Sequence, residues 1–239
     1  MYTIEILNKR VSLYRNIHAD KAHAITLFEA LNSIRTGIYK SQIENVRRLY
    51  SFGQPSTARY KSKKKQLPSF LFSGSLFETK FKFDLYGYTS LLVIDIDRPE
   101  SIDTIKESLK NDSYIISTWL SPSGNGLKAL LYIEYDIACA INDGWIYHEH
   151  CAFPQVQKYL RHTYGIEIDH TGADITRLCF VSYDPNIHLK KEFEPFKVTC
   201  NLSNNKIHQI RWKYYSQKKI RNAINEQRKI AKLLNKSAD

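Results

Sequence analysis

The most strongly patterned stretch of the chain is 91–97, which reads Leu-Leu-Val-Ile-Asp-Ile-Asp. Four consecutive aliphatic residues are typical of a strand that is buried on both faces. Residues i and i+2 of a strand point to the same face, so we expect the carboxylates of Asp95 and Asp97 side by side. Such like charges repel unless a positive group lies between them, and Mg²⁺ and Mn²⁺ prefer carboxylate oxygens. The alternative is that Asp97 caps a helix beginning at Pro99.

The segments before this strand predict an opening strand or irregular piece, two helices, a basic loop, and a strand with its turn next to the central strand: 2–15, 19–34, 41–49, 59–65 and 67–77. Asp20 is the candidate N-cap of the first helix, and Gly37 ends it. The capping-box pattern Ser41–Glu44 opens the second helix, which the Gly53–Pro55 pair closes.

The segments after the central strand predict further helices and strands. Helices are expected around 102–109, over 143–164 with an interruption near Pro154, and in an amphipathic tail from 207. We expect strands at 114–120, 127–135 and 178–182, a short extended piece at 166–169 and a turn at 183–186. This mixture predicts an α+β or α/β chain with a mixed sheet, organised as a domain over 1–200 and a basic helical tail over 201–239.

Charge changes this picture more than any other compositional feature. The 239 residues carry a formal net charge of +11, and residues 201–239 hold ten Lys or Arg against two acids. A second basic cluster comprises Arg59, Lys61, Lys63, Lys64 and Lys65, preceded by Arg47 and Arg48. Such patches favour a nucleic-acid partner over the alternative of a solvated, lysine-rich surface.

Other compositional features narrow the class of protein. No apolar run approaches the roughly 20 residues needed to span a bilayer, and the N-terminus lacks the layout of a signal peptide. The four cysteines are scattered without a Cys-x-x-Cys pair. We therefore expect a cytoplasmic protein that does not interact with membranes and has no zinc knuckle.

Two further motifs carry candidate chemistry. The loop Ser-Pro-Ser-Gly-Asn-Gly-Leu-Lys at 121–128 leads into a strand, and its glycines, Ser123 and Lys128 could surround an anion, although the same sequence suits an ordinary hairpin. Asp169 ends an Ile-x-Ile stretch and Arg177 follows eight residues later. This pair could serve a reaction or form a structural salt bridge.

In this order and spacing, the motifs resemble the archaeo-eukaryotic primase superfamily, the primase–polymerases. The chain looks most like the VirE N-terminal-domain branch found on bacterial mobile elements. The resemblance covers roughly residues 65–190, and four blocks carry it: Leu67–Gly74, Val93–Asp97, Ser121–Lys128, and Asp169 through Arg177 into Cys179–Pro185.

The resemblance implies a primase-like core with an RRM-like mixed or antiparallel sheet flanked by helices. It implies nucleotidyl transfer onto a DNA template from NTPs or dNTPs, and similar domains are often fused to, or encoded beside, a helicase. Two Mg²⁺ or Mn²⁺ ions would be held by Asp95, Asp97 and Asp169. The nucleotide would be held by the following residues: Ser123, Gly124, Asn125, Gly126, Lys128 and Arg177. Many members carry a histidine where this chain has Lys128, and lysine supplies charge without titrating near neutrality.

Several alternatives stay open. The same carboxylates could serve a metal-dependent nuclease, or the fold could be a nucleic-acid-binding module without turnover. His148-Glu-His150 lies in a segment expected to be helical, which disfavours a rolling-circle nuclease or zinc site. The charge of +11 argues against a glycosyltransferase, although such enzymes also use Asp-x-Asp with a divalent metal.

Overall fold

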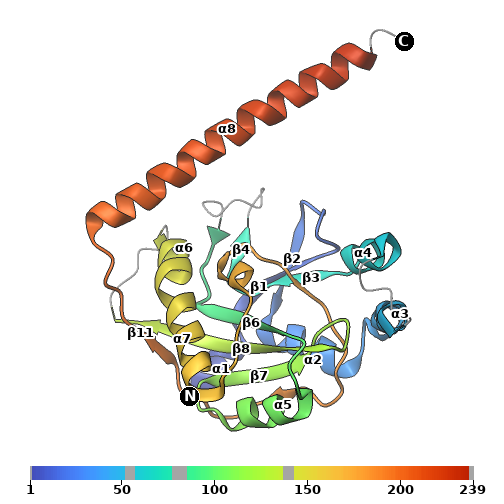
Figure 1. Cartoon of the computed structure of the whole chain (residues 1–239), viewed down its shortest axis with the longest axis vertical. Coiled ribbons are helices and arrows are strands. Elements are labelled where there is room, and N and C mark those ends of the chain that lie inside the picture. Colours follow the sequence, from blue (N-terminus) through green and yellow to red (C-terminus); the bar gives the residue numbers. More distant parts are fainter. Residues whose placement is uncertain (1, 52–56, 77–84, 137–142, 237–239) are drawn as a thin grey trace. The chain divides into compact units, whose positions relative to one another are not determined.

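The computed structural model of the chain describes residues 2–51, 57–76, 85–136 and 143–236. The chain divides into two compact units, Met1–Cys200 and Asn201–Asp239. The first unit is mixed α+β, with antiparallel sheets flanked by helices (Figure 1). The second unit contains the helix α8 (Asn204–Lys236), which confirms the predicted helical tail.

The strand that carries the two carboxylates belongs to the larger sheet. β8 (Gly126–Tyr135) pairs antiparallel with β6 (Leu91–Asp97) and with β7 (Ile115–Leu120), and parallel with β11 (Phe196–Val198). The short β10 (His188–Leu189) pairs with β7. The predicted strands at 91–97, 114–120 and 127–135 are confirmed within one residue.

The second sheet is antiparallel throughout and contains β2 (Ala22–Thr26), β1 (Arg10–Tyr14), β3 (Ser69–Leu71) and β9 (Cys179–Phe180), in that order. The prediction that stretch 67–77 lies next to the central strand is wrong at the level of strand pairing, because β3 pairs with β1 and β9. A hydrogen bond from Thr89 N–H to the Ser73 carbonyl (2.9 Å) connects this stretch to the segment just before β6. β4 (Ser75–Leu76) and β5 (Leu85–Tyr86) form a separate ribbon.

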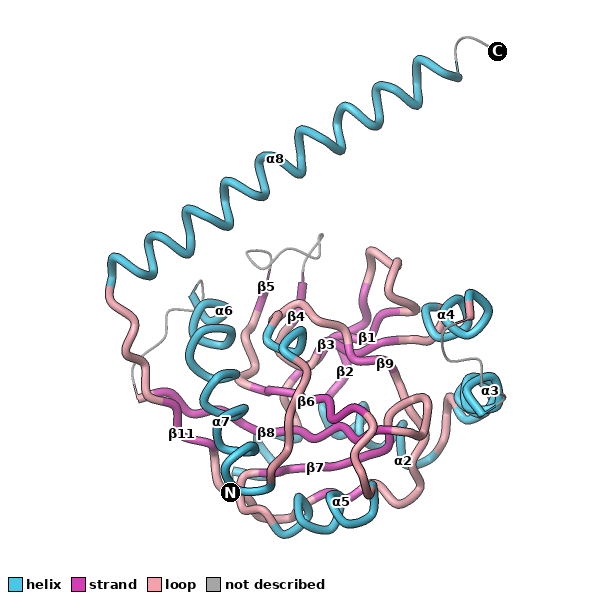
Figure 2. Tube along the Cα trace, viewed as in Figure 1, coloured by secondary structure: helices cyan, strands magenta, loops and turns pink. Residues whose placement is uncertain are grey.

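Helices surround the sheets, as the tube view in Figure 2 shows. Their bounds are α1 (Tyr2–Leu7), α2 (Leu27–Thr36), α3 (Lys40–Ser51), α4 (Ala58–Lys65), α5 (Ile102–Asn111), α6 (Gly144–Tyr147), the π-helix η3 (His148–Ala152), α7 (Phe153–Tyr164) and the 3₁₀ helix η4 (His170–Ala173). The η3 turn confirms the interruption expected before Pro154. The expected helix closure at Gly53–Pro55 lies outside the described residues.

The first predicted helix is wrong in its N-terminal half. Residues 22–26 form β2, because β1 offers a complete antiparallel partner to them. The cap of α2 is therefore Thr26 and not Asp20: the Thr26 side chain accepts from Glu29 N–H, and the Glu29 carboxylate accepts from Thr26 N–H. Gly37 ends the helix in the left-handed conformation (φ 76°), as expected.

The prediction of a loop for the basic segment 59–65 is also wrong, because this segment forms the helix α4. The Thr57 side chain caps it by accepting from Tyr60 N–H (3.2 Å). Tyr60 is buried, with its ring edge-on to that of Tyr50 on α3. Four of the five basic side chains lie on the exposed part of α4, and Lys64 is half-buried.

A hydrophobic core joins the two sheets and fixes the position of β6. Leu91 of β6, Phe70 of β3 and Trp119 of β7 belong to one buried cluster. The rings of Phe72 and Trp119 lie 6.0 Å apart, between the elements of both sheets. The core contact of Leu91 fixes the N-terminal end of β6. Asp95 and Asp97 lie at the other end of the same strand.

Candidate functional site

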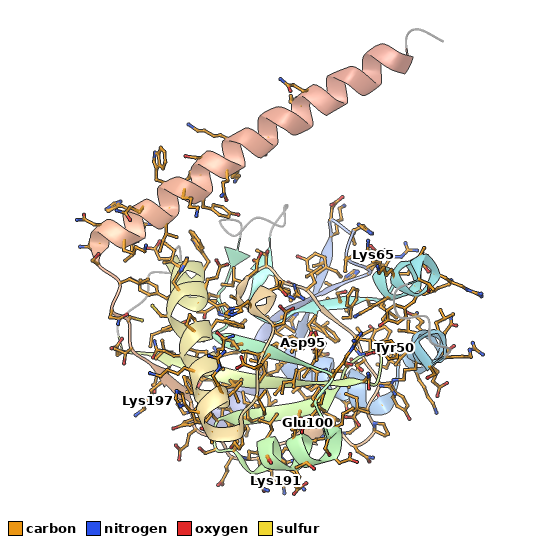
Figure 3. All side chains as sticks on the ribbon, viewed as in Figure 1. Tyr50, Lys65, Asp95, Glu100, Lys191 and Lys197 are labelled. Atoms are coloured by element: carbon orange, nitrogen blue, oxygen red, sulfur yellow. The ribbon has the colours of Figure 1, made fainter. Side chains whose placement is uncertain are left out.

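The face of β6 that carries both carboxylates lines a cavity. Leu91, Val93, Asp95 and Asp97 line this cavity, which has a volume of about 470 Å³. The other face of the strand carries Ile94, which is fully buried. The expected side-by-side placement of Asp95 and Asp97 therefore follows from the strand geometry. Figure 3 shows Asp95 on β6, within the first unit.

Lys128 lies directly opposite Asp95 in the β6–β8 ladder. Its Nζ donates to Asp95 Oδ2 at 2.6 Å, and the lysine is only 6% exposed. Burial lowers the pKa of Lys128, and the charge and hydrogen bond of the Asp95 carboxylate raise it. Because burial raises the pKa of the Cys179 thiol, that thiol is neutral at pH 7 and Asp95 holds the lysine charge in place.

The second oxygen of Asp95 has a different environment. Asp95 Oδ1 is buried, and no described residue makes a hydrogen bond to it. A buried carboxylate oxygen without a donor is costly, and an oxygen-preferring cation would remove that cost. Asp95 Oδ1 and the exposed carboxylate of Asp97 are therefore the donor set that fits a divalent cation.

Asp169 lies near this pair through its main chain. Its N–H donates to the Asp95 carbonyl at 3.5 Å. Its carboxylate, however, accepts from the N–H (2.9 Å) and hydroxyl of Thr171 and from Arg177 Nη2 (3.3 Å). The Thr171 hydrogen bonds lower the pKa of Asp169.

Of the three acids expected to form one metal site, Asp95 and Asp97 line the cavity, whereas the Asp169 carboxylate accepts hydrogen bonds from Thr171 and Arg177. Asp169 is not among the residues that line the cavity. No group of three metal-ligating side chains occurs within the described ranges 2–51, 57–76, 85–136 and 143–236. Asp95 and Asp97 form the part of the expected site that the structure assembles.

The segment that follows Asp169 contributes residues that the sequence analysis missed. Asp174 lines the cavity, and its Oδ1 accepts from the N–H (2.9 Å) and hydroxyl (2.8 Å) of Thr176. Arg177, which was expected at the site, also lines it. No spacing in the sequence distinguishes Asp174 from Asp169 as the cavity residue, because the difference arises from the 3₁₀ turn η4 between them.

The loop expected to hold a triphosphate divides into two parts. Ser121, Pro122 and Ser123 line the cavity, whereas Gly124, Asn125 and Gly126 do not. The Asn125 amide donates to Tyr50 OH (3.0 Å), so it ties the loop to α3. The loop therefore offers the Ser123 hydroxyl to the cavity.

The two glycines of this loop have structural roles. Gly124 adopts a left-handed conformation (φ 76°). A Cβ at Gly126 would lie 2.8 Å from the Ile96 carbonyl oxygen, so glycine permits the close approach of β8 to β6.

Lys64 is the basic residue of α4 that reaches the cavity. Its ammonium lies 5.7 Å from the Phe180 ring centroid and 5.9 Å from that of Tyr60. Burial lowers the pKa of Lys64, and the charge of Lys128 lowers it further. The remaining basic residues expected to bind DNA are exposed on α4, outside the cavity lining: Arg59, Lys61, Lys63 and Lys65 (Figure 3 labels Lys65).

The two histidines of the His-Glu-His motif are in different environments. His148 begins the π-helix η3, is buried and lines the cavity, and its Nδ1 lies 3.0 Å from Tyr88 OH. His150 is exposed. The helical setting expected for this motif is confirmed, and the two histidines differ in burial.

Comparison with known proteins places the chain in a family. The model of the family described as BT4734-like, N-terminal domain, matches residues 62–188. The chain belongs to this family. The matched region contains β6, β8, the 121–126 loop, Lys64 and Arg177, and therefore most of the cavity. No curated protein and no solved structure matches the chain.

None of the described helices has the length and apolar content that crossing a bilayer requires.

Proposed function

We propose that this protein is a metal-dependent nucleotidyltransferase of the primase–polymerase type, which extends a nucleic-acid strand on a DNA template. The observation that carries the proposal is the pair Asp95 and Asp97 on one face of β6, with the buried Oδ1 of Asp95, which accepts no hydrogen bond from any described residue. Carboxylates in this arrangement suit a divalent cation, and neighbouring cations suit a triphosphate.

The arrangement of elements supports an RRM-like core for this proposal. The order along the chain is β6, α5, β7, β8 and α7, followed by the extended piece 166–169. In space, β8 lies between β6 and β7, and the Asp169–Asp95 main-chain hydrogen bond brings the last piece alongside β6. This arrangement supports the strand order of a βαββαβ sheet, with the extended piece 166–169 in the place of the last strand.

The side chains around the carboxylates have separate roles in the proposed reaction. A divalent cation at Asp95 and Asp97 would neutralise and orient the phosphoryl oxygens during transfer. Lys64 and Arg177 would neutralise the remaining phosphate charge, and the Ser123 hydroxyl would donate to a phosphate oxygen. The exposed basic side chains of α4 and the positive charge of α8 would bind template phosphates.

A second candidate function is a nucleic-acid-binding module without turnover. The observation that favours it is the Lys128–Asp95 ion pair, which occupies one carboxylate oxygen, together with the hydrogen bonds from Thr171 and Arg177 that already engage the Asp169 carboxylate. Under this alternative, the carboxylates and lysine would stabilise the sheet, and the basic helices would bind nucleic acid.

One experiment separates these candidates. The full chain is incubated with a primed DNA template, NTPs or dNTPs, and Mn²⁺, and the labelled primer is resolved by length. Extended primer is the expected result. Shortened DNA would instead support a nuclease, and unchanged DNA with a gel shift would support the binding module.

A further inference from the structure

The ammonium of Lys128 occupies a position where a second metal ion would be expected. In a two-metal site, the ions lie about 3.5–4 Å apart and share carboxylate ligands. Asp95 is the carboxylate that could be shared here, because Oδ1 has no hydrogen-bond partner among the described residues while Oδ2 contacts Lys128 Nζ at 2.6 Å. Within this part of the chain, one oxygen already has a cation and the other has none.

The pairing of β6 with β8 fixes the position of the Lys128 ammonium. Asp95 and Lys128 are direct partners in the β6–β8 ladder, so their side chains leave the sheet on the same face. Lys128 is buried, with 6% of its surface exposed. Moving the ammonium away from Asp95 would leave a buried charge without a partner, which is strongly unfavourable.

The charge around the cavity also limits how many cations it can take. Among the described residues, the acidic and basic side chains that line it, His148 apart, are three of each kind: Asp95, Asp97, Asp174, Lys64, Lys128 and Arg177. Their formal charge is zero with His148 neutral. Two divalent ions would therefore place four uncompensated positive charges in a cavity of about 470 Å³ before any nucleotide enters.

We propose that Lys128 takes the place of one of the two metal ions, so that Asp95 Oδ1 and Asp97 hold a single divalent cation in the nucleotide-free protein. This inference rests on the proposed function, since it concerns the same carboxylates. It also assigns Lys128 a role other than contact with the triphosphate: the lysine is the fixed counter-charge of Asp95.

The test counts bound ions directly. The nucleotide-free full chain is titrated with Mn²⁺, and free Mn²⁺ is followed by electron paramagnetic resonance. The wild-type chain is expected to bind one ion. Two bound ions would overturn the inference and leave the proposed function standing, whereas no bound ion would overturn both.

Two variants make the test specific for Lys128. Lys128→Gln keeps a hydrogen-bond donor but removes the charge, and it is expected to bind a second Mn²⁺. Lys64→Gln removes the same charge from the same cavity without touching the Asp95 carboxylate, and it is expected to keep one ion. If Lys128→Gln binds the same number of Mn²⁺ ions as the wild type, Lys128 does not replace a metal ion. The titration of the wild-type chain remains a test of the inference even if a variant fails to fold.

Discussion

At the scale of single residues, Ser123 provides the clearest test of nucleotide contact, because its hydroxyl lines the cavity at the edge of the loop. A hydroxyl bonded to a charged phosphate contributes about 1.5–3 kcal/mol. Ser123→Ala should therefore raise the KM for nucleotide by about tenfold or more in primer-extension kinetics, with template affinity unchanged.

Ser62→Ala is the matched control for that measurement, because Ser62 is exposed on α4 and outside the cavity lining. It should leave the KM for nucleotide at the wild-type value. A normal KM in the Ser123 variant would remove the hydroxyl from the nucleotide site.

Gly126 tests the close approach of β8 to β6. Its substitution by alanine would place Cβ 2.8 Å from the Ile96 carbonyl oxygen, which is backbone and cannot rotate away. Overpacking of this kind costs about 1–3 kcal/mol of unfolding free energy, measurable by urea denaturation.

Gly172→Ala serves as the comparison, since its Cβ would meet a Phe153 ring carbon at 3.1 Å and a ring can shift. Its loss of unfolding free energy should be the smaller of the two. Equal stability of the Gly126 variant and the wild type would contradict the strand contact.

The sequence predicts the placement of a side chain correctly where that placement depends on a single strand or helix. The common face of Asp95 and Asp97 follows from the period of a single strand. The ion pair of Asp95 with Lys128 does not, because it depends on the register between two strands 33 residues apart. The same limit applies to Asp169, because the hydrogen bonds of its carboxylate with Thr171 and Arg177 depend on the fold of the segment that follows it.

At the scale of elements, Asp112 joins α5 to α7. It follows the last residue of α5 and is buried, and its Oδ2 accepts hydrogen bonds from Tyr159 OH (2.6 Å) and Tyr164 OH (2.7 Å) of α7. Burial and the bond to Asp112 raise the pKa of Tyr159, and they raise the pKa of Tyr164 to about 12.

This arrangement predicts how stability depends on pH. Both hydroxyls ionise less readily in the folded chain than in the unfolded chain, where tyrosine has its ordinary pKa of 10.0. The contribution of Tyr164 is therefore complete below pH 10 and is lost as the pH rises through about 12. When the pH is raised from 8 to 11, the urea midpoint of the wild type should fall, and that of Tyr164→Phe should fall by less. An identical fall in both proteins would contradict the role of this hydroxyl.

The sequence predicted strands better than it predicted the boundaries of helices. β6, β7 and β8 are runs of apolar and β-branched residues, whose pattern survives in the fold. In contrast, β2 was read as helix, since 22–26 becomes a strand only because β1 pairs with it. The segment 59–65 was read as a loop from its charge, but the Thr57 cap and the buried Tyr60 make it a helix.

At the scale of the whole molecule, charge is concentrated in α8. The segment 201–239 has ten basic residues and two acids. If α8 binds template, changing three of its exposed lysines to glutamine should make the slope of log affinity against log salt shallower by about 2 on single-stranded DNA, since each phosphate contributes about 0.7. The three lysines are Lys206, Lys213 and Lys219.

A triple glutamine variant of exposed lysines outside α8 controls for net charge: Lys21, Lys158 and Lys197 (Figure 3 labels Lys197). It should leave the salt slope close to the wild-type value. If both variants change the slope equally, binding follows the overall charge of the chain and α8 is not a specific DNA contact.

The α+β class and the order of elements from β6 to β8 could be predicted from the sequence, whereas the division into two sheets could not. β3 and β9 are more than a hundred residues apart in the chain, yet they pair directly in the sheet, with β1 on the other side of β3. Contacts of this kind depend on packing between distant segments, and local patterns carry no information about them.

The central claim is that Asp95 and Asp97 form the centre of a nucleotidyl-transfer site. The most direct test is Mn²⁺-dependent primer extension by the wild type, Asp95→Asn, Asp97→Asn and the control Asp103→Asn, whose carboxylate is exposed on α5 and outside the cavity lining. We expect extension by the wild type and the control, and a loss of at least about 100-fold in both site variants, with DNA binding retained. Near-normal extension by either Asp95→Asn or Asp97→Asn would contradict the account.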